Sequence, residues 1–378
     1  FGYPIDLGAI LITEQADNPL VSSASENGKR LVSMDFGNVE FKVKGLEENK
    51  TNGEALMNKA LSLLELLHKY MIDNHHSLKN KSLEEITTLF CFKKKLSKVS
   101  RWLTKYGIKF ITSNLSTKLK GVKDYIDRGA PGFNADVSMT PDGYINILKP
   151  FAENLNIKLN INVVEVKQNS KEVKVIDSKG KVYSADYVIV TVPLGVLKAN
   201  SIKFTPSLSE AKQNAISQLR MFDMNKIFVE FTEKFWGDND FLGLVYDEKL
   251  VYRFVVNFNK VNQENVLCFM ISGDDYKYLE ARTPEEVKGE IITLLKTLYP
   301  GKEINITKFK MTDWHRDQFT RGSFSELAGL KSDREEFSKP ESRVYFAGEH
   351  SSLEWNSFVY GAYMSGIRAA KQIIDLKK

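Results

Sequence analysis

Residues 187–192, Tyr-Val-Ile-Val-Thr-Val, restrict the fold of this chain more than any other segment. The run is rich in β-branched residues, carries no charge and ends at Pro193, which has no N–H to donate to a neighbouring strand. Strands without a polar face are typical of parallel sheets that helices cover on both sides. The segment therefore predicts a strand buried on both faces of a parallel sheet, in a mixed α/β fold.

The C-terminal region has the pattern of a strand, a turn and a helix. A strand is expected at 343–347, followed by a turn at Gly348-Glu349, a loop, and a helix at 361–377. A helix N-terminus presents unpaired N–H groups and a partial positive charge, so a strand, glycine turn and helix form a layout suited to nucleotides. Many α/β proteins use the same order for packing alone, and the layout by itself does not establish a ligand.

The rest of the chain alternates between helical and extended patterns. Apolar residues at helical spacing predict a helix over 54–70, and Ser82-Leu-Glu-Glu opens another with a capping box, so that 54–126 should be mainly helical. An amphipathic helix is expected at 143–155, followed by a short antiparallel meander over 157–183. Strands and helices alternate again over 224–310.

Composition and charge exclude several classes of protein. The 378 residues suffice for a large core, and no apolar run is long enough to cross a bilayer, so we expect a soluble protein without a transmembrane segment. Lysine and arginine outnumber aspartate and glutamate by 53 to 48, partly through basic residues at 93–109. Aromatic residues are sparse there, which favours a solvated helix face and predicts no nucleic-acid partner.

The two cysteines point to no covalent framework. Cys91 and Cys268 lie far apart in apolar contexts, with neither a disulfide pattern nor a metal-ligand spacing, and we expect both to be buried structural thiols. No metal site is predicted. The compartment is left unknown, with a reducing intracellular compartment or an organelle favoured.

Two short runs, Val-Pro-Leu-Gly-Val-Leu at 192–197 and Phe-Ala-Gly-Glu-His at 346–350, carry a family resemblance. With Asp-Leu-Gly-Ala-Ile at 6–10 and the aromatic segment 314–325, they resemble the flavin-dependent amine oxidases in order and spacing. This family includes polyamine oxidases and lysine-specific histone demethylases. The resemblance implies an FAD-binding Rossmann-like domain and a substrate domain, with the active site between them. We assign residues 1–14, 141–205 and 335–378 to the FAD-binding domain, and residues 15–140 and 206–334 to the substrate-binding domain.

The resemblance also implies where FAD would be held. Segment 6–10 matches the strand that runs beside the isoalloxazine ring, Glu349 matches the residue that binds the ribose and ribityl region, and Val359 matches the residue whose N–H faces the N1/O2 edge. A strand-end glycine and a helix-capping acid are the ordinary alternatives. No cysteine lies near these segments, so the FAD is expected to be non-covalent. The implied cofactor-binding residues are Gly8, Ala9, Val163, Pro193, Gly348, Glu349 and Val359.

Lys226 is the implied catalytic residue, because it matches the lysine that holds a water against flavin N5. A strand lysine usually faces solvent, but the apolar neighbours Ile227 and Val229 predict burial. A desolvated ammonium has a lowered pKa, which suits a residue that handles water and a proton.

Aromatic residues are the implied substrate-binding group. Phe324 and Phe358 match the two positions that sandwich the substrate amine, since aromatic faces hold an aliphatic amine by dispersion and attract its cationic form. An ordinary aromatic core is the alternative reading. Thr13 occupies a position where some polyamine oxidases carry a glutamate. The predicted substrate pocket comprises Thr13, Trp314, Phe319, Phe324 and Phe358.

The family's N-terminal Gly-x-Gly-x-x-Gly loop is missing from this sequence, and with it the first βαβ unit. The first residue is not Met, and we read this start as an internal boundary. The loop could lie upstream, another segment or chain could fill its place, or the protein could have lost FAD. A chromatin demethylase is disfavoured, because 206–310 is too short for the helical insertion that docks its corepressor.

We therefore predict an FAD-dependent amine oxidase acting on small, polyamine-like substrates. It would transfer a hydride from the amine α-carbon to flavin N5, and O2 would reoxidise the flavin and yield H2O2. The alternative is a catalytically inactive protein of the same fold, serving as a structural or interaction subunit of a larger assembly.

Overall fold

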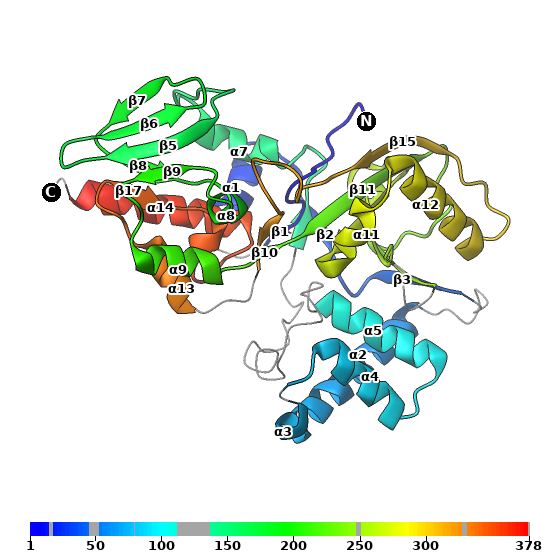
Figure 1. The fold of residues 1–378 in the computed structure, drawn as a ribbon. Coiled ribbons are helices and arrows are strands. Elements are labelled where there is room, and N and C mark those ends of the chain that lie inside the picture. Colours follow the sequence, from blue (N-terminus) through cyan, green and yellow to red (C-terminus); the bar gives the residue numbers. More distant parts are fainter. Residues whose placement is uncertain are drawn as a thin grey trace. The chain divides into compact units, whose positions relative to one another are not determined.

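The computed structural model describes residues 1–14, 18–44, 53–78, 80–111, 137–246, 251–326 and 331–376 (Figure 1). The chain forms two compact units. The first comprises Phe1–Tyr144 and Met224–Thr312, and the second comprises Ile145–Asp223 and Asp313–Lys378. Both units are discontinuous in sequence. They are defined by packing, so the boundaries of the cofactor and substrate domains stay a prediction.

A six-stranded sheet organises the first unit. All its neighbouring strands are antiparallel except β12 and β3, which run parallel. In spatial order the strands are β15 (Ile306–Met311), β11 (Met224–Phe231), β14 (Val266–Ser272), β13 (Phe254–Asn257), β12 (Phe241–Val245) and β3 (Val39–Val43).

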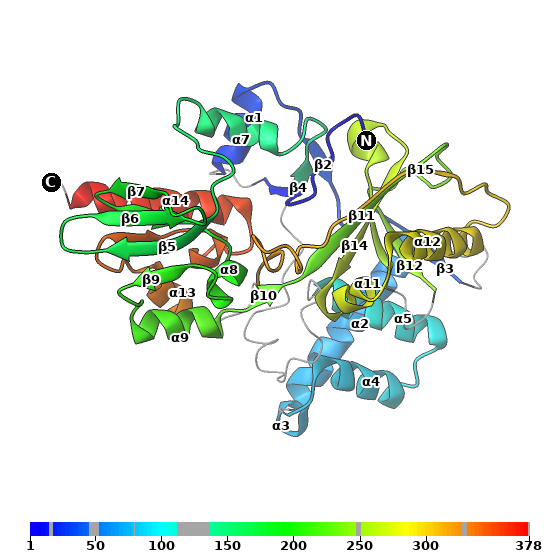
Figure 2. The same ribbon diagram turned by 45° about the horizontal axis from the view of Figure 1, so that its top comes forward.

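Side chains on the two faces of this sheet enter two different cores. Alternate residues of a strand point to opposite faces, so Phe228 of β11 packs in one cluster and its neighbours Ile227 and Val229 pack in the other. Residues of α2 (Gly53–Asp73) and α5 (Lys98–Ile111) belong to the first cluster, and residues of α12 (Pro284–Leu298) belong to the second. Figure 2 gives a second view of these elements.

Most of the predicted helical region is confirmed. Ser82 caps α4 (Leu83–Lys93) with the expected box, in which Glu85 N–H donates to the Ser82 hydroxyl and Ser82 N–H donates to the Glu85 carboxylate. A short α3 (His75–Leu78) and α5 complete the group. Residues 112–126 of the prediction lie outside the described residues. Cys91 and Cys268 are free and buried.

Smaller elements complete the first unit. They are α1 (Pro19–Glu26), α10 (Asn259–Asn262), α11 (Tyr276–Glu280) and the three-stranded sheet of β1 (Ile12–Thr13), β4 (Val137–Met139) and β2 (Val32–Met34).

The second unit contains the predicted meander. The strands β5 (Val163–Gln168), β6 (Val173–Asp177) and β7 (Val182–Ala185) pair antiparallel, which confirms it, and β9 (Lys203–Thr205) runs parallel to β5. The predicted start at 157 is wrong, because residues 157–162 are exposed and form no strand. The preceding helix α7 (Ile145–Ala152) is shorter than predicted at both ends.

The strand predicted over 187–192 is β8 (Val188–Val190), and it pairs parallel with β17 (Val344–Phe346). The parallel pairing is confirmed. Burial on both faces is wrong, since only Val190 of the three residues is buried. Among the described residues, β8 and β17 form a sheet of two strands, and a sheet this small does not fully bury the side chains of Val188 and Ile189.

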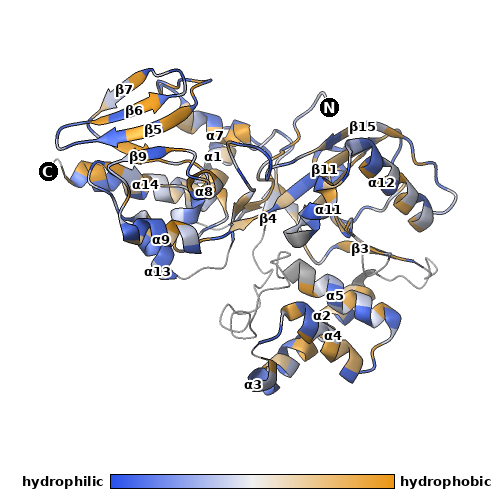
Figure 3. Ribbon diagram, viewed as in Figure 1, coloured by the Kyte–Doolittle hydropathy of each residue, from blue (hydrophilic) through white to orange (hydrophobic). Residues whose placement is uncertain are grey.

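Four further α-helices and a two-stranded sheet belong to the second unit. They are α8 (Leu194–Lys198), α9 (Glu210–Gln218), α13 (Lys331–Ser338), α14 (Val359–Asp375) and the two-stranded sheet of β10 (Met221–Phe222) and β16 (Phe324–Ser325). Helix α14 begins two residues before the predicted start at Gly361. Figure 3 shows polar and apolar residues interspersed along the helices, as expected where one face is buried.

The elements confirm the predicted mixed α/β class. Within the ranges described, none of the helices combines the length and the apolar character that a membrane crossing requires.

Candidate functional site

Lys226 lies on β11, the strand beside the edge strand β15 in the first unit's sheet, and is buried with 5% of its surface exposed. Its ammonium group donates hydrogen bonds to the carbonyl oxygen of Leu7 at 3.1 Å and to that of Gly8. Burial lowers the pKa of Lys226 to about 8, against smaller opposing effects of Cys268 and Asp6. The structure thus brings the predicted catalytic lysine together with Gly8, a predicted cofactor-binding residue.

The face of β11 that carries Lys226 also holds the start of the chain. The ring of Phe228 meets that of Phe1, with 6.4 Å between centroids, and the Glu230 carboxylate accepts a hydrogen bond from the Tyr3 hydroxyl. Lys226, Phe228 and Glu230 are spaced by two and therefore share one face of the strand. Side chains that project from this strand therefore contact several residues of segment 1–8.

Gly8 and Ala9 are exposed and belong to no strand, so the strand predicted over 6–10 is wrong. Side-chain contacts hold this segment, and Asp6 accepts a backbone hydrogen bond from Tyr144 at 3.0 Å. A Cβ atom built on Gly8 would find no neighbouring atom within 4 Å. Packing within the chain does not require a glycine there, and the open space beside the backbone fits the approach of a flat ligand.

Thr13 is buried in β1, where it pairs with Val137 of β4. The side chain of Asn18 donates to the Thr13 carbonyl at 2.7 Å and to its hydroxyl at 3.4 Å. The next residue, Glu14, accepts a hydrogen bond from the Ser138 hydroxyl. These contacts give Thr13 a structural setting, and its substrate role stays a prediction.

In the second unit, Glu349 binds the two segments that carry predicted substrate-binding residues. Its carboxylate accepts hydrogen bonds from the Ser325 N–H at 2.8 Å, the Ser325 hydroxyl at 2.6 Å and the Ser357 N–H at 2.7 Å. Ser325 directly follows Phe324, and Ser357 directly precedes Phe358. One carboxylate therefore joins the two segments that carry the predicted substrate-binding rings.

Arg334 supports this junction from α13. It is buried, and its guanidinium donates to the Ser325 hydroxyl at 3.2 Å and to the His350 carbonyl at 2.9 Å. The sequence reasoning did not identify Arg334, Ser325 or Ser357. Ser325 and Ser357 could have been found from the sequence, because each adjoins a predicted substrate-binding phenylalanine. No sequence pattern pointed to Arg334.

The four aromatic residues occupy different environments. Phe324 is half-buried and packs on Phe222, with 4.9 Å between ring centroids. Trp314 and Phe358 are also half-buried, whereas Phe319 is 54% exposed. The Trp314 carbonyl accepts a hydrogen bond from Gly322 N–H at 2.9 Å, which closes the turn that presents Phe324.

Glycines of the two characteristic runs are required by close approaches. A methyl group on Gly195 of α8 would overlap the carbonyl oxygens of Thr320 and Arg321, and one on Gly348 would overlap the ring of His350. Gly348 also has a backbone φ angle of 120°, which residues with a side chain rarely adopt. Gly195 thus docks α8 against the turn between Trp314 and Phe324.

The remaining predicted cofactor residues lie at the starts of elements. Val163 is half-buried and begins β5, and Pro193 is the N-cap of α8. The 17-residue helix α14 begins at Val359, and its N-cap residue is Phe358. The Phe358 side chain makes no capping hydrogen bond to the first N–H groups of the helix. Within the described ranges, no group of His, Cys, Asp and Glu side chains is arranged to hold a metal ion.

Comparisons with known proteins give a matching family and several relatives. The family model for flavin containing amine oxidoreductases matches residues 1–374. Polyamine oxidase 4 of Oryza sativa subsp. japonica is 36% identical over 233 residues, which are 61% of this chain and 48% of that protein. Polyamine oxidase 1 of Zea mays is 34% identical over 226 residues, 58% of this chain and 45% of that protein.

A solved structure shares the fold. Cyclohexylamine oxidase from Brevibacterium oxydans IH-35A superposes with a TM-score of 0.72 at 18% identity, over 99% of this chain and 89% of that one. The chain spans about half the length of the curated relatives it matches.

Proposed function

The chain belongs to the family of flavin containing amine oxidoreductases, and from this we propose that it functions as an FAD-dependent oxidase of small amines, with polyamines as the substrate class. The polyamine oxidases among its relatives support that class. The main structural support is Lys226, a buried lysine of lowered pKa that contacts the Gly8 backbone.

FAD, held without a covalent bond, would supply the oxidising chemistry: it accepts a hydride from the amine α-carbon and is reoxidised by O2 to give H2O2. Two features of the chain fit this cofactor. The space beside Gly8 admits a flat ring, and the N-terminus of α14 offers backbone N–H groups that no cap side chain satisfies.

Lys226 would hold a water molecule through its ammonium group. With a pKa of about 8, the side chain is mostly protonated at neutral pH and can donate, yet it releases a proton at modest cost. The bonds to Leu7 and Gly8 fix the direction of the ammonium, leaving its third N–H for water.

Phe324 and Phe358 would orient the amine between their rings, and Glu349 would keep both segments in place. A carboxylate has about four acceptor positions. Three of those on Glu349 are used by Ser325 and Ser357, so one is left for a hydroxyl of the cofactor. The N-terminus of α14 at Val359 would stabilise negative charge on the ring. Val163, Pro193 and Gly348 would contribute backbone contacts.

The alternative is a non-catalytic subunit of the same fold, for which a protein partner or assembly would be required. The observation that favours it is the engagement of Glu349 and Lys226 by groups of their own chain, which gives each a structural role without FAD.

The visible absorption spectrum of the purified protein, expressed with whatever sequence flanks these residues, separates the two. We expect a flavin spectrum that bleaches when spermine or N-acetylspermine is added without oxygen and returns when air is admitted. A folded protein that stays colourless after incubation with FAD would contradict the proposal and favour the non-catalytic subunit.

A further inference from the structure

The hydroxyl group of Ser325 lies between a buried arginine and the carboxylate of Glu349. It donates a hydrogen bond to Glu349 Oε2 at 2.6 Å and accepts one from Arg334 Nη1 at 3.2 Å. Both directions follow from the groups themselves, because an ionised carboxylate has no proton to donate and a guanidinium has no acceptor atom. Arg334 therefore directs the proton of the Ser325 hydroxyl to Glu349.

Arg334 also strengthens this bond. A hydroxyl group that accepts a hydrogen bond from a cation becomes a better donor, and the effect is larger where water is excluded. Arg334 is buried with 3% of its surface exposed, and burial lowers the pKa of its guanidinium, an effect that the charge of Glu349 opposes. Without the arginine, the Ser325 hydroxyl would be free to rotate toward another acceptor.

The two oxygens of Glu349 are engaged to different extents. Oε2 accepts two bonds, from the Ser325 hydroxyl and from Ser357 N–H at 2.7 Å. Oε1 accepts one, from Ser325 N–H at 2.8 Å, and His350 Nδ1 lies 3.9 Å from it, too far for a hydrogen bond. A carboxylate oxygen has two acceptor positions, so the position that remains is on Oε1.

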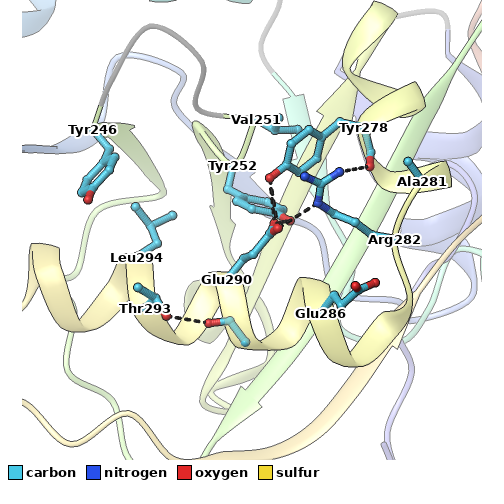
Figure 4. Close-up of a pocket in the computed structure, with 11 residues that line it drawn as sticks. Tyr246, Val251, Tyr252, Tyr278, Ala281, Arg282, Glu286, Glu290, Thr293 and Leu294 are labelled. Carbon is cyan, nitrogen blue, oxygen red and sulfur yellow. Dashed lines mark hydrogen bonds and ion pairs between the residues drawn. The ribbon is translucent and has the colours of Figure 1, made fainter.

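Glu290 of the first unit shows the opposite arrangement (Figure 4). It lines a cavity of about 880 Å³, where Arg282 Nε donates directly to its Oε1 at 2.8 Å and the Tyr252 hydroxyl donates to its Oε2. The Tyr278 hydroxyl lies 3.1 Å from both oxygens. Each oxygen of Glu290 thus has two donors, and its acceptor positions are filled by the chain. At Glu349 the arginine acts through a serine instead, and one position is kept.

Arg334 makes two further bonds that are structural. Its guanidinium donates to the carbonyl oxygens of Glu326 and of His350, the second at 2.9 Å. These bonds hold α13 against the two segments that Glu349 joins. A role limited to this support would rest on the two carbonyls, whereas a role in cofactor binding needs the Ser325 hydroxyl. The two roles therefore predict different consequences of removing that hydroxyl.

We propose that Arg334 is a positioning residue for the cofactor: through the Ser325 hydroxyl it holds Glu349 with Oε1 available to a hydroxyl group of FAD. The inference rests on the proposed function, because FAD is the ligand. Arg334 does not touch the cofactor and acts through Ser325 and Glu349.

A double-mutant cycle on FAD affinity tests this relay. Equilibrium dialysis of FAD against the FAD-free proteins, expressed with their flanking sequence, would compare the wild type, Arg334→Lys, Ser325→Ala and the double variant. The lysine keeps the charge but not the fork of donors. We expect each single change to weaken binding about tenfold, the scale of one charge-assisted hydrogen bond. The double variant should bind no more weakly than the weaker single variant, because both changes remove the same bridge.

Arg368→Lys is the matched control. Arg368 belongs to the same unit and donates to the carbonyl oxygens of Phe346 and Ser351. Any effect of Arg368→Lys on FAD affinity should add to that of Ser325→Ala. Additive effects of Arg334→Lys and Ser325→Ala, about a hundredfold together, would overturn the proposal. Coupling of equal size in the Arg368 cycle would also overturn it, because the effect would then not be specific to Arg334.

Two further outcomes are decisive. Ser325→Ala needs no change to the buried arginine, so wild-type FAD affinity in this variant would overturn the relay even if Arg334→Lys does not fold. Urea unfolding of each variant would show that it is folded. A wild-type protein that binds no FAD would overturn the proposed function and this inference with it, whereas additive effects in a protein that binds FAD would overturn this inference alone.

Discussion

The carboxylate of Glu349 accepts two hydrogen bonds from Ser325, one from its N–H at 2.8 Å and one from its hydroxyl at 2.6 Å. With the third bond from Ser357, this arrangement fixes the segments that carry Phe324 and Phe358. The glutamate that family resemblance assigns to the cofactor is therefore also a structural junction of its own unit.

Replacement of Glu349 by glutamine should destabilise the protein even without FAD. The amide keeps one acceptor oxygen but directs an N–H₂ group at a donor of Ser325 or Ser357, which costs about 1–3 kcal/mol. Denaturant unfolding of the FAD-free protein measures this. Glu335→Gln, at an exposed position of α13, is the control and should change stability little. Equal stability of the Glu349→Gln and Glu335→Gln proteins would show that Glu349 does not hold the two segments together.

Gly195→Ala should destabilise the second unit. Its methyl group would overlap the backbone oxygens of Thr320 and Arg321, and backbone cannot move aside as a flexible side chain can. We expect a loss on the order of 1–3 kcal/mol, as for overpacked positions. Gly366→Ala, with open space around its Cβ, should be neutral or stabilising. A Gly195→Ala protein that melts at the wild-type temperature would show that α8 does not dock as described.

Replacement of His350 should change how stability depends on pH. Burial lowers the pKa of His350 to about 4, opposed by Glu349. The unfolded chain therefore binds a proton between about pH 6.5 and 4 that the folded protein does not, and stability falls as the pH drops through this window. His350→Phe should remove on the order of 1–3 kcal/mol of this decline. Urea unfolding at pH 7 and pH 5 would test it, and parallel pH curves for both proteins would contradict it.

Lys226→Met should increase stability at neutral pH. Because burial lowers the pKa of Lys226 to about 8, the folded protein carries the cost of a desolvated charge below that pH. As the pH rises from about 8 to 10.5, the unfolded state binds more protons and the wild-type protein gains stability, whereas the variant should not. The expected gain at pH 7 is on the order of 1–3 kcal/mol. A destabilised variant would mean that the bonds to Leu7 and Gly8 outweigh the burial cost.

Sequence reasoning reached some of this site and not the rest. The burial of Lys226 was predictable, because its apolar neighbours Ile227 and Val229 indicate a buried strand. The family motifs located Glu349, but its bonds to Ser325 and Ser357 follow from chain folding and leave no periodic pattern.

Two errors have a common cause. The strand over 6–10 was implied by the family resemblance, yet the segment is held by Lys226 and neighbouring side chains, without a strand partner. Residues 187–192 are apolar enough for full burial, but the extent of burial depends on elements distant in sequence. Strand propensity predicts local conformation. Which elements bury a strand, and which strand it pairs with, depend on the tertiary structure.

Anaerobic reduction of the FAD-loaded protein by spermine tests the central claim most directly. Lys226→Met should retain bound FAD and slow flavin reduction by about 10²-fold or more, the usual scale for losing a positioned proton-handling group. Lys174→Met, at a half-buried lysine of β6 that pairs with Glu172, should reduce at the wild-type rate. Equal reduction rates for the wild-type and Lys226→Met proteins would contradict the role assigned to Lys226.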